Sequence, residues 1–554
     1  MRRSAIALAL AIPVLLVACD AATESTTTVG SEAPSTTAPG TIGSTSTGPE
    51  EIRVVLSGEE AHPEGFTVPA GEVWVFDPET DTTVTVGANV IVEGRLEMQP
   101  ASGDIEHVLR FEGVDVSSFA GGGMDPVATD TGLWVMGDGQ LLIEGEEKTA
   151  WSYEYDPAWE GDEVVAAPNS PEDYETFETV TDTPAPNELG YPTELLNLTR
   201  NVRIEGTPEG YTHLFLRSTM PQTIRYAAIR YVAPAFGDTD ATGRYGMHIH
   251  MSGDGSRGSI VEGVVISDAD NHAFVPHASH GITFQDTIAY DVYNEPYWWD
   301  EPAEEEDTTN DTHDLVWDRA VAALVRQGFA GSNFRLSAFA LGNGENVTVT
   351  NSVAVGLEGE EFSDRAGFNW PESGGAVWTF ENNIAHNNGS NGIFVWQNNS
   401  ERHDIDDFLA YYNGGAGVSH GAYGNSYQYN NLTLQENGLA VISHALGEEN
   451  PDQDAQTWTS ITTDGAVLII DEHQTEPEAP VRFVGCDFGE VIVADAEGAA
   501  PSLYEFIDCG LEPEDFDLGE AHPEGIFRVQ QADGTAYELS GDGTVTDIET
   551  FYSG

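Results

Sequence analysis

Basic residues are scarce in this sequence. Its 554 residues include 20 lysines and arginines against 94 aspartates and glutamates, and Lys148 is the sole lysine, so the formal net charge is −74. This composition argues against nucleic acid as a partner, because phosphate binding requires concentrated positive charge. Acidity spread along the whole chain favours solubility in a salty medium. It would repel an acidic polysaccharide unless salt screens the field or a bound cation bridges the carboxylates.

Long apolar runs are also missing, apart from Ala5–Ala18 near the start, which follows Arg2 and Arg3. That run is shorter than the roughly 20 residues a membrane-spanning helix requires, and it is typical of a secretory signal. A small residue precedes Cys19, as in the lipobox of bacterial lipoproteins. We therefore predict a lipoprotein signal peptide over residues 1–19, acylation of Cys19, and attachment at the bacterial cell surface by the N-terminal lipid alone. The alternative is an ordinary signal peptide with an incidental cysteine.

Large apolar side chains are almost absent from residues 20–50, which are rich in Ser, Thr, Gly and Pro. Such a stretch cannot bury enough surface to offset the entropy lost on ordering, so it is predicted to be a disordered tether. The roughly 500 residues that remain suffice for several domains or for one long solenoid.

A helical hydrophobic period is nearly absent from residue 51 onward. Short runs of Val, Ile, Phe, Tyr and Trp alternate with Gly, Asn and Asp, which is typical of strands and turns in an all-β chain. Residues 264–271 are matched 23 positions later by residues 287–294. An aliphatic residue followed by a small one recurs further on, at Val353, Ile384 and Leu409, with a looser copy at Leu432.

A period near 23 residues, with three short strands in each repeat, predicts a right-handed parallel β-helix over residues 191–510. Each coil adds a layer about 4.8 Å above the last, and crossovers between parallel strands are right-handed. Cys486 and Cys509 are also 23 residues apart. Stacked one coil apart they lie within reach of a disulfide, which suits an exported protein, and a pair of free thiols is the alternative.

The two ends of the repeat region differ from its middle. Residues 51–190 are rich in glycine and aromatic residues, which predicts a separate β module that also covers the first coil. Periodicity fades over residues 511–554, where Asp533-Gly534 and Asp542-Gly543 predict the turns of a terminal hairpin and a β cap.

Histidines gather in one stretch, since five of the fifteen lie between residues 248 and 280. His248 and His250 alternate along a predicted strand, so both point to the same side. His277 and Asp300 are 23 residues apart, so we expect them to stack in one stripe beside that pair. These four residues are the predicted catalytic group.

Three uses of this group are possible. His248, His250 and His277 could hold a divalent cation, calcium or zinc. Asp300 and a neighbouring acid could act as an acid/base pair on a glycosidic bond, and histidine could transfer protons near neutral pH. The alternative is a hydrogen-bonded histidine stack without a ligand.

Several other residues are candidates for substrate contact. Tyr297, Trp298 and Trp299 are expected to stack on sugar rings. Arg244 could bind a substrate carboxylate or form a structural ion pair. The acidic loop Glu301–Thr312 could bind calcium or simply be solvated. A further stripe could extend a glycan groove or belong to the core, and comprises Trp370, Trp378, Trp396 and Gln397. We interpret His272 and His280 as structural.

A family resemblance runs through the same segment. The stretch Gly243–His250 (GRYGMHIH), then SIVEGVVISDADNHAF, the pair His277 and His280, and DTIAYDV resemble, in order and spacing, cell-migration-inducing hyaluronan-binding protein and transmembrane cell-surface hyaluronidase. Upstream, LTRNVRIEG resembles the family's entry strand. The eight-glycine domain of that family is similar to residues 68–145, with matches at Gly71, Gly87, Gly94, Gly113, Gly132, Gly137, Gly139 and Gly145.

This resemblance implies an eight-glycine module, a β-helix, and hyaluronan binding or depolymerisation. The sequence as a whole predicts a monomeric, surface-anchored protein that hydrolyses an extracellular polysaccharide, hyaluronan-like or other. Two alternatives stay open: a non-catalytic glycan-binding or adhesion lipoprotein, and a β-helix polysaccharide lyase.

Overall fold

The structure is a computed structural model that describes residues 52–119, 125–235, 243–298, 312–328, 336–341, 344–361, 363–370, 378–395, 403–421, 427–444, 456–471, 480–495, 501, 503–519 and 521–553. In these ranges every regular element is a strand or a 3-10 turn, and none is an α-helix. Cys19 and the predicted tether lie outside the described residues. Residues 51–554 form one compact unit.

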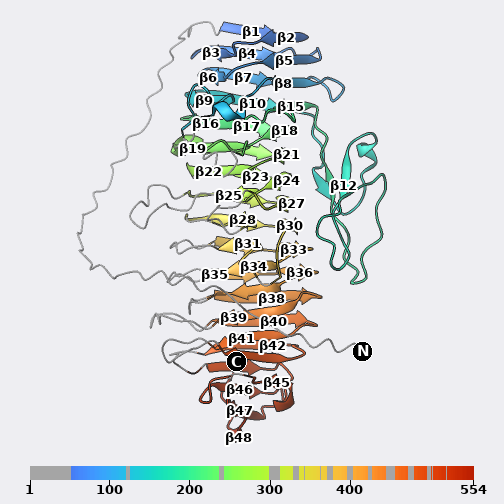
Figure 1. Cartoon of the computed structure of the whole chain (residues 1–554), viewed down its shortest axis with the longest axis vertical. Coiled ribbons are helices and arrows are strands. Elements are labelled where there is room, and N and C mark those ends of the chain that lie inside the picture. Colours follow the sequence, from blue (N-terminus) through green and yellow to red (C-terminus); the bar gives the residue numbers. More distant parts are fainter. Residues whose placement is uncertain are drawn as a thin grey trace, which may run out of the picture. The chain divides into compact units, whose positions relative to one another are not determined.

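Parallel strands stack in three columns (Figure 1). In most coils each column has one strand, and in the coils toward the C-terminal end one longer strand serves the first two columns. The first column contains β1 (Ile52–Leu56), β4 (Glu72–Phe76), β7 (Arg95–Met98), β10 (Gln140–Glu144), β17 (Thr223–Arg225), β20 (Ile260–Glu262), β23 (Thr283–Gln285), β26 (Val316–Asp318), β29 (Val347–Thr350), β32 (Trp378–Glu381), β35 (His403–Asp406), β38 (Tyr427–Gln435), β40 (Thr457–Thr463), β42 (Val481–Cys486), β44 (Leu503–Ile507) and β46 (Ile526–Gln530). The second contains β2 (Glu59–His62), β5 (Thr82–Val86), β8 (His107–Phe111), β15 (Val202–Glu205), β18 (Ala227–Val232), β21 (Val265–Ala269), β24 (Ile288–Tyr293), β27 (Val321–Arg326), β30 (Val353–Leu357), β33 (Ile384–His386) and β36 (Leu409–Tyr411), and the end of β38 continues it.

The third column forms a sheet of its own and carries the candidate site. It contains β3 (Phe66–Val68), β6 (Val90–Val92), β9 (Leu133–Gly137), β16 (Leu214–Ser218), β19 (Met247–Gly253), β22 (Phe274–Ser279), β25 (Tyr297–Trp298), β28 (Ser337–Ala340), β31 (Ala366–Trp370), β34 (Asn391–Val395), β37 (Ala416–His420), β39 (Leu439–His444), β41 (Val467–Asp471), β43 (Val491–Asp495) and β45 (Phe516–Asp517). Three parallel columns of strands, stacked coil upon coil, are a right-handed parallel β-helix, as predicted.

The observed register follows the spacing in the sequence at most coils. Ile266 pairs with Ala289, a shift of 23 residues, and Val353 pairs with Ile384 as its repeat predicts. The looser copy at Leu432 is wrong by one position, because Leu409 pairs with Thr433. The extra residue enters before β38, because His403 of β35 already pairs with Tyr427, a shift of 24 residues.

Aromatic rings fill the interior coil by coil, because residues facing inward at equivalent positions lie directly above one another. Phe274, Tyr297, Phe339 and Phe368 stack with successive ring centroids 5.1, 4.5 and 4.7 Å apart. All four are fully buried. This ladder keeps the third column in register, so that the side chains facing outward on the same strands stack as well.

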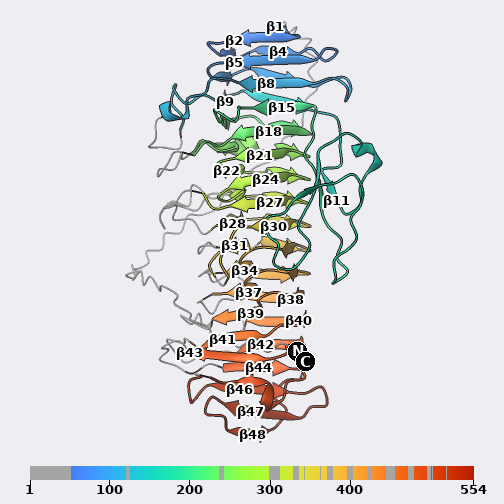
Figure 2. The ribbon, with the colours of Figure 1, turned by 45° about the vertical axis from the view of Figure 1, so that its right-hand side comes forward.

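A small antiparallel sheet packs on the outside of the second column (Figures 1 and 2). Its strands are β11 (Trp151–Ser152), β12 (Val164–Ala166), β13 (Glu178–Thr179) and β14 (Leu195–Asn197). Trp151 of this sheet belongs to the same buried cluster as Ile288 and Val321, which come from successive coils. The buried carboxylate of Glu194, next to β14, is hydrogen-bonded to His386 Nε2 at 3.0 Å, so this sheet braces several coils of the stack.

The expected boundary near residue 190 does not coincide with a change of sheet. Strands β1 to β10 lie in the same three columns as the later strands, and β10 pairs directly with β17. Glycines are frequent here because neighbouring coils approach closely. A Cβ on Gly94 would lie 2.3 Å from the Glu72 carbonyl oxygen, and one on Gly139 would lie 2.0 Å from that of Val92. The eight-glycine assignment itself stays a prediction.

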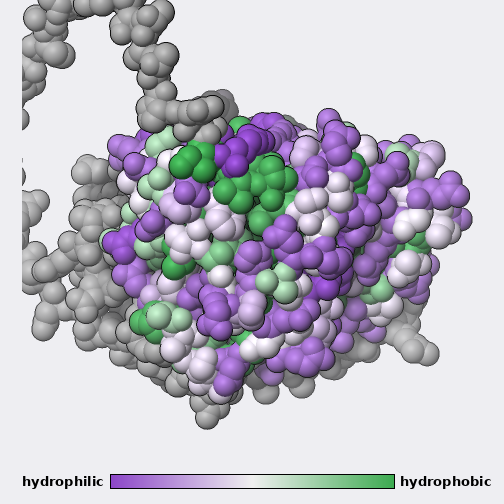
Figure 3. Space-filling view, turned by 90° about the horizontal axis from the view of Figure 1, so that it is seen from above, coloured by the Kyte–Doolittle hydropathy of each residue, from purple (hydrophilic) through white to green (hydrophobic). Residues whose placement is uncertain are grey.

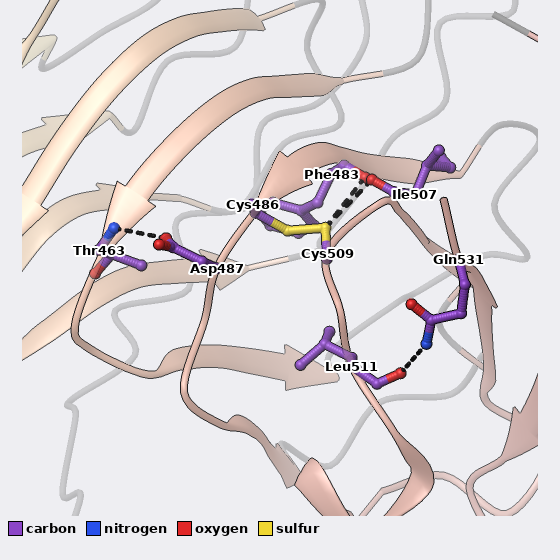
Figure 4. The surroundings of a disulfide bond; sticks show 8 residues. All are labelled: Thr463, Phe483, Cys486, Asp487, Ile507, Cys509, Leu511 and Gln531. Carbon is purple, nitrogen blue, oxygen red and sulfur yellow. Dashed lines mark hydrogen bonds between the residues drawn. A yellow bond between two sulfur atoms is a disulfide. The ribbon is translucent and has the colours of Figure 1, made fainter. Parts of the chain in front are cut away.

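The two ends of the stack differ. At the C-terminal end, β46, β47 (Ala536–Ser540) and β48 (Val545–Ile548) form the antiparallel hairpins predicted from the Asp-Gly turns. At the N-terminal end, Ile52 and Val55 are more than half exposed, and Figure 3 shows apolar surface on the face seen from above. The structure joins Cys486 and Cys509 in a disulfide between adjacent coils, with their Cα atoms 4.4 Å apart (Figure 4). Among the described residues, no helix is long and apolar enough to cross a membrane.

Candidate functional site

Two neighbouring strands of the third column bring the predicted histidines together. Met247 and Ile249 of β19 point into the core, so His248 and His250 point outward. His250 pairs with His277 of β22 in the next coil. We call His248, His250 and His277 the histidine cluster. One donor nitrogen from each ring lies within 4.8 Å of the others.

The spacing of the histidine cluster suits a small metal ion. The His248 Nε2 and His250 Nδ1 atoms are 3.3 Å apart. A tetrahedral ion held at about 2.05 Å by each nitrogen places two ligand atoms about 3.3 Å apart. His277 completes a set of three, with its ring centroid 4.8 Å from that of His250. Three imidazoles favour zinc and its transition-metal neighbours over calcium, which takes oxygen ligands.

Although the histidine cluster faces outward, other segments cover it, and its members are at most 5% exposed. The Gly243 carbonyl oxygen lies 2.9 Å from His248 Nδ1, and the Tyr245 ring packs 4.9 Å from that of His248. Asp125 lies 3.2 Å from His250 Nε2. Phe215 of β16 packs under both rings of β19. These contacts fix the orientation of the imidazoles, as supporting groups around metal ligands do.

Burial keeps the imidazoles of β19 neutral. The pKa of His248 lies well below its ordinary value, because burial disfavours the charged ring and His250 and His277 add repulsion. Burial, followed by repulsion from His277, lowers the pKa of His250 to about 4. A neutral imidazole has a lone pair to give to a metal ion, so these shifts favour ligation down to mildly acidic pH.

The lowered pKa values predict acid sensitivity. The pKa of an unfolded histidine is about 6.5, whereas the pKa of His250 in the folded protein is lowered to about 4. Between these pH values the unfolded chain therefore binds more protons than the folded one. The free energy of unfolding should therefore fall as the pH drops from about 6.5 to about 4. Urea unfolding across this range measures it. His250→Gln should flatten the slope relative to the wild type, and an unchanged slope would contradict the prediction.

Arg244 is a structural residue in this structure. Its guanidinium is 2% exposed and forms an ion pair with Asp130, whose carboxylate is fully buried, at 2.5 Å. The same guanidinium donates to the Asp125 carbonyl oxygen at 3.3 Å. Arg244 thus holds the segment that carries Asp125 against the histidine cluster. The predicted contact with a substrate carboxylate is replaced by this internal pair.

The two described members of the predicted aromatic platform, Tyr297 and Trp298, are both buried. Tyr297 is expected from the sequence to stack on sugars, but it lies in the core, and its hydroxyl donates to the Val321 carbonyl oxygen at 3.2 Å. The reason is strand alternation, which turns Tyr297 inward and Trp298 outward. Trp298 is 3% exposed and stacks on His272 at 4.5 Å, beside Tyr245.

Other candidates fall in three groups. Trp370 and Trp378 belong to the core, where they stack at 5.5 Å. Two further histidines make internal contacts: His272 Nδ1 lies 3.3 Å from the Glu295 carboxylate, and His280 Nδ1 accepts from the His313 backbone N–H. Several predicted residues lie outside the described part of the chain, namely Asp300, Trp299, Trp396, Gln397 and positions 301–311 of the acidic loop.

Asp125 and Asp130 are the site residues that the sequence does not reveal. They lie more than a hundred positions before His250, in a glycine-rich stretch without a metal-ligand or catalytic spacing. Their one signal is the presence of Arg244, which needs a carboxylate partner once buried in an acidic chain.

Comparisons with known proteins give no family assignment. No family model matches the chain, and no curated protein matches it. Among solved structures, the periplasmic alginate epimerase AlgG is 12% identical and covers 80% of this chain and 76% of its own, with a TM-score of 0.23. A bacteriophage receptor-binding protein, a podoviral tailspike in a myovirus, is 10% identical over 91% of this chain and 83% of its own, with a TM-score of 0.24. The tailspike of Pseudomonas phage phi297 is 10% identical over 78% and 71%, also at 0.24.

TM-scores this low support no inference about the site. The β-helix assignment rests on the strand pairing of this chain, and the resemblance to the hyaluronan-binding family stays a prediction from sequence.

Proposed function

We propose that this chain is an exported, polysaccharide-active protein whose centre is the histidine cluster loaded with a divalent ion of the zinc class. The observation that carries the proposal is the convergence of three buried imidazoles on the outer side of adjacent strands, with donor atoms within 4.8 Å. Two of them have pKa values lowered by burial, which keeps their lone pairs available. Export and acylation of Cys19 are part of this proposal and rest on the sequence alone.

The chemistry open to such a centre follows from its parts. His248, His250 and His277 would hold the divalent ion, which would supply a Lewis acid for an oxygen of the glycosidic linkage or of a sugar substituent. Asp125, beside His250 and largely exposed, is placed to exchange a proton at the outer edge of the cluster. Tyr245 is nearly fully buried and packs 4.9 Å from His248, so it excludes water from the inner side of the cluster. Acyl or glycosidic cleavage of a polysaccharide uses all three features.

A second candidate is a non-catalytic glycan-binding protein. The observation in its favour is the burial of the histidine cluster, since at most 5% exposure leaves little room for a substrate to reach the ion. In that case the ion, held as in a structural zinc site, would stabilise the coils.

The test is incubation of the purified full chain with neutral and uronate-containing polysaccharides, together with elemental analysis. We expect about one zinc-class ion per chain, and chain shortening that a chelator removes and added zinc restores. An unsaturated end group in the products would indicate a lyase. Binding without shortening would favour the second candidate, and a protein without metal would refute the proposed centre.

A further inference from the structure

A shallow pocket lies at the corner where the second column turns into the third. Its lining consists of Ala235, Asp270, Tyr293, Gln327 and Gly328. These residues come from four successive coils, at or just beyond the ends of β18, β21, β24 and β27. We call this the corner pocket. With about 4.8 Å between coils, it extends along the stack by about 14 Å, which suits a chain of linked units lying along the corner.

Of the three acids around the corner pocket, Asp268 and Asp291 pair with arginines, and Asp270 pairs with no described arginine. Asp268 lies 3.3 Å from Arg230, and Asp291 forms an ion pair with Arg326. No described side chain donates a hydrogen bond to the Asp270 carboxyl group or forms an ion pair with it. Burial raises the pKa of Asp270 to about 6, and repulsion from Asp291 and Asp268 adds to the effect. Both oxygens of this carboxylate are therefore open to hydrogen-bond donors from a ligand.

The remaining lining is polar and aromatic. The side-chain oxygen of Gln327 is buried and accepts no hydrogen bond from any described group. Tyr293 offers a partly exposed ring from the coil between Asp270 and Gln327. Gly328 adds no side chain to the pocket, and a Cβ there would lie only 2.1 Å from Asn294 Oδ1. Unpaired acceptors beside a flat ring are the features that recognise the hydroxyls and apolar face of a sugar.

Charge decides which sugars fit. Three carboxylates, those of Asp268, Asp270 and Asp291, face two arginines that are already paired. The chain as a whole carries −74. A uronate or sulfated sugar would bring a further negative charge to this place without a cation to receive it.

We propose that the corner pocket binds the sugar residues of an uncharged polysaccharide, with hydroxyl groups donating to the Asp270 carboxylate and to Gln327. This depends on the proposed function only in that the ligand is a glycan. Asp270 is two residues before His272, and Tyr293 is two before Glu295. The Glu295 carboxylate lies 3.3 Å from His272 Nδ1, and the His272 ring stacks on Trp298. A glycan held at this corner therefore lies beside the strands that carry the histidine cluster.

The proposal predicts a pH dependence. The groups that face Asp270 are Asp268, Asp291, Tyr211 and Tyr293, and Tyr231 packs on Tyr211. Arg230 pairs with Asp268, and Arg326 pairs with Asp291. Hydroxyl donors stabilise the charged carboxylate, so a bound sugar lowers the pKa of Asp270. By linkage the affinity falls as the pH drops through about 6, by about tenfold for each unit by which the sugar lowers that pKa.

Calorimetric titration of the full chain with neutral gluco-, manno- and galacto-oligosaccharides, and with uronate oligosaccharides of equal length, tests this at about pH 7.5 and about pH 5. We expect at least one neutral series to bind, more weakly at the lower pH, and the uronates to bind at least about tenfold more weakly. Asp270→Asn should weaken binding about tenfold at the higher pH and abolish the pH dependence. Tyr293→Ala should weaken it at both pH values.

Asp406→Asn is the matched control, because it neutralises a partly buried acid of a distant coil and should leave binding unchanged. The Asp270→Asn protein should unfold at no lower temperature than the wild type, since it removes a carboxylate that burial penalises. Failure of every neutral sugar to bind, equal binding by Asp270→Asn, or binding of calcium alone would overturn the proposal. Loss of the metal centre would not overturn it, because the corner pocket is separate from the histidine cluster. A metal-free His277→Gln protein should still bind the neutral sugar.

Discussion

Replacing His277 by glutamine should lower the affinity for zinc by about a hundredfold or more and abolish polysaccharide cleavage. The side chain belongs to the histidine cluster, whose three donor atoms lie within 4.8 Å of one another. Two imidazoles alone leave a divalent ion without the third protein ligand that zinc sites use. Glutamine fills similar space and keeps a polar end, so the fold should survive.

His403→Gln is the matched control for this change. His403 is equally buried, and burial lowers its pKa to about 4. It lies in β35, several coils away from the histidine cluster, and stacks on Tyr427. Elemental analysis, zinc titration and turnover should single out His277→Gln. Retention of zinc and full activity by that variant would leave the histidine cluster a structural stack. Equal loss of zinc in both variants would show that the substitution acts by destabilising the fold and not by removing a metal ligand.

The coil and its register were predictable because a solenoid repeats one physical requirement. Every coil must place an inward-facing residue above the equivalent residue of the preceding coil. The spacing of 23 residues between Ile266 and Ala289 therefore predicts their pairing. The same regularity predicted the disulfide between Cys486 and Cys509. Where a coil gains a residue, as between β35 and β38, the spacing misleads by one position.

The candidate site was predictable only in its local part. His248 and His250 share a face by strand alternation, and His277 follows from the register of β19 with β22. The same alternation, applied strictly, would have placed Tyr297 in the core. The partners Asp125 and Asp130 come from a connection between strands, where neither a period nor a spacing relates sequence to position. Contacts of this kind depend on the path of the whole connection and not on a local pattern.

Replacing Arg244 by methionine should destabilise the protein by about 3–5 kcal/mol, because it leaves the carboxylate of Asp130 buried without its cation. The change also releases the segment that holds Asp125 beside His250, so zinc affinity should fall by about tenfold, as for other groups that orient metal ligands. Urea unfolding and zinc titration measure the two effects. Arg244→Met combined with Asp130→Leu should recover much of the stability, since no buried charge is then left unpaired.

Arg217→Met provides the comparison on the same segment. Arg217 pairs with Asp125 at 3.0 Å, but both side chains are exposed, by 41% and 62%, so its loss should cost at most about 1 kcal/mol. The effect of the Arg244→Met substitution on stability distinguishes a structural role of Arg244 from a substrate-binding one. If Arg244→Met unfolds like the wild type and only raises KM for an acidic glycan, the guanidinium contacts substrate, as the sequence allowed. If stability falls and the double variant restores it, the buried pair with Asp130 is its role, and the histidine cluster depends on that pair for its outer wall.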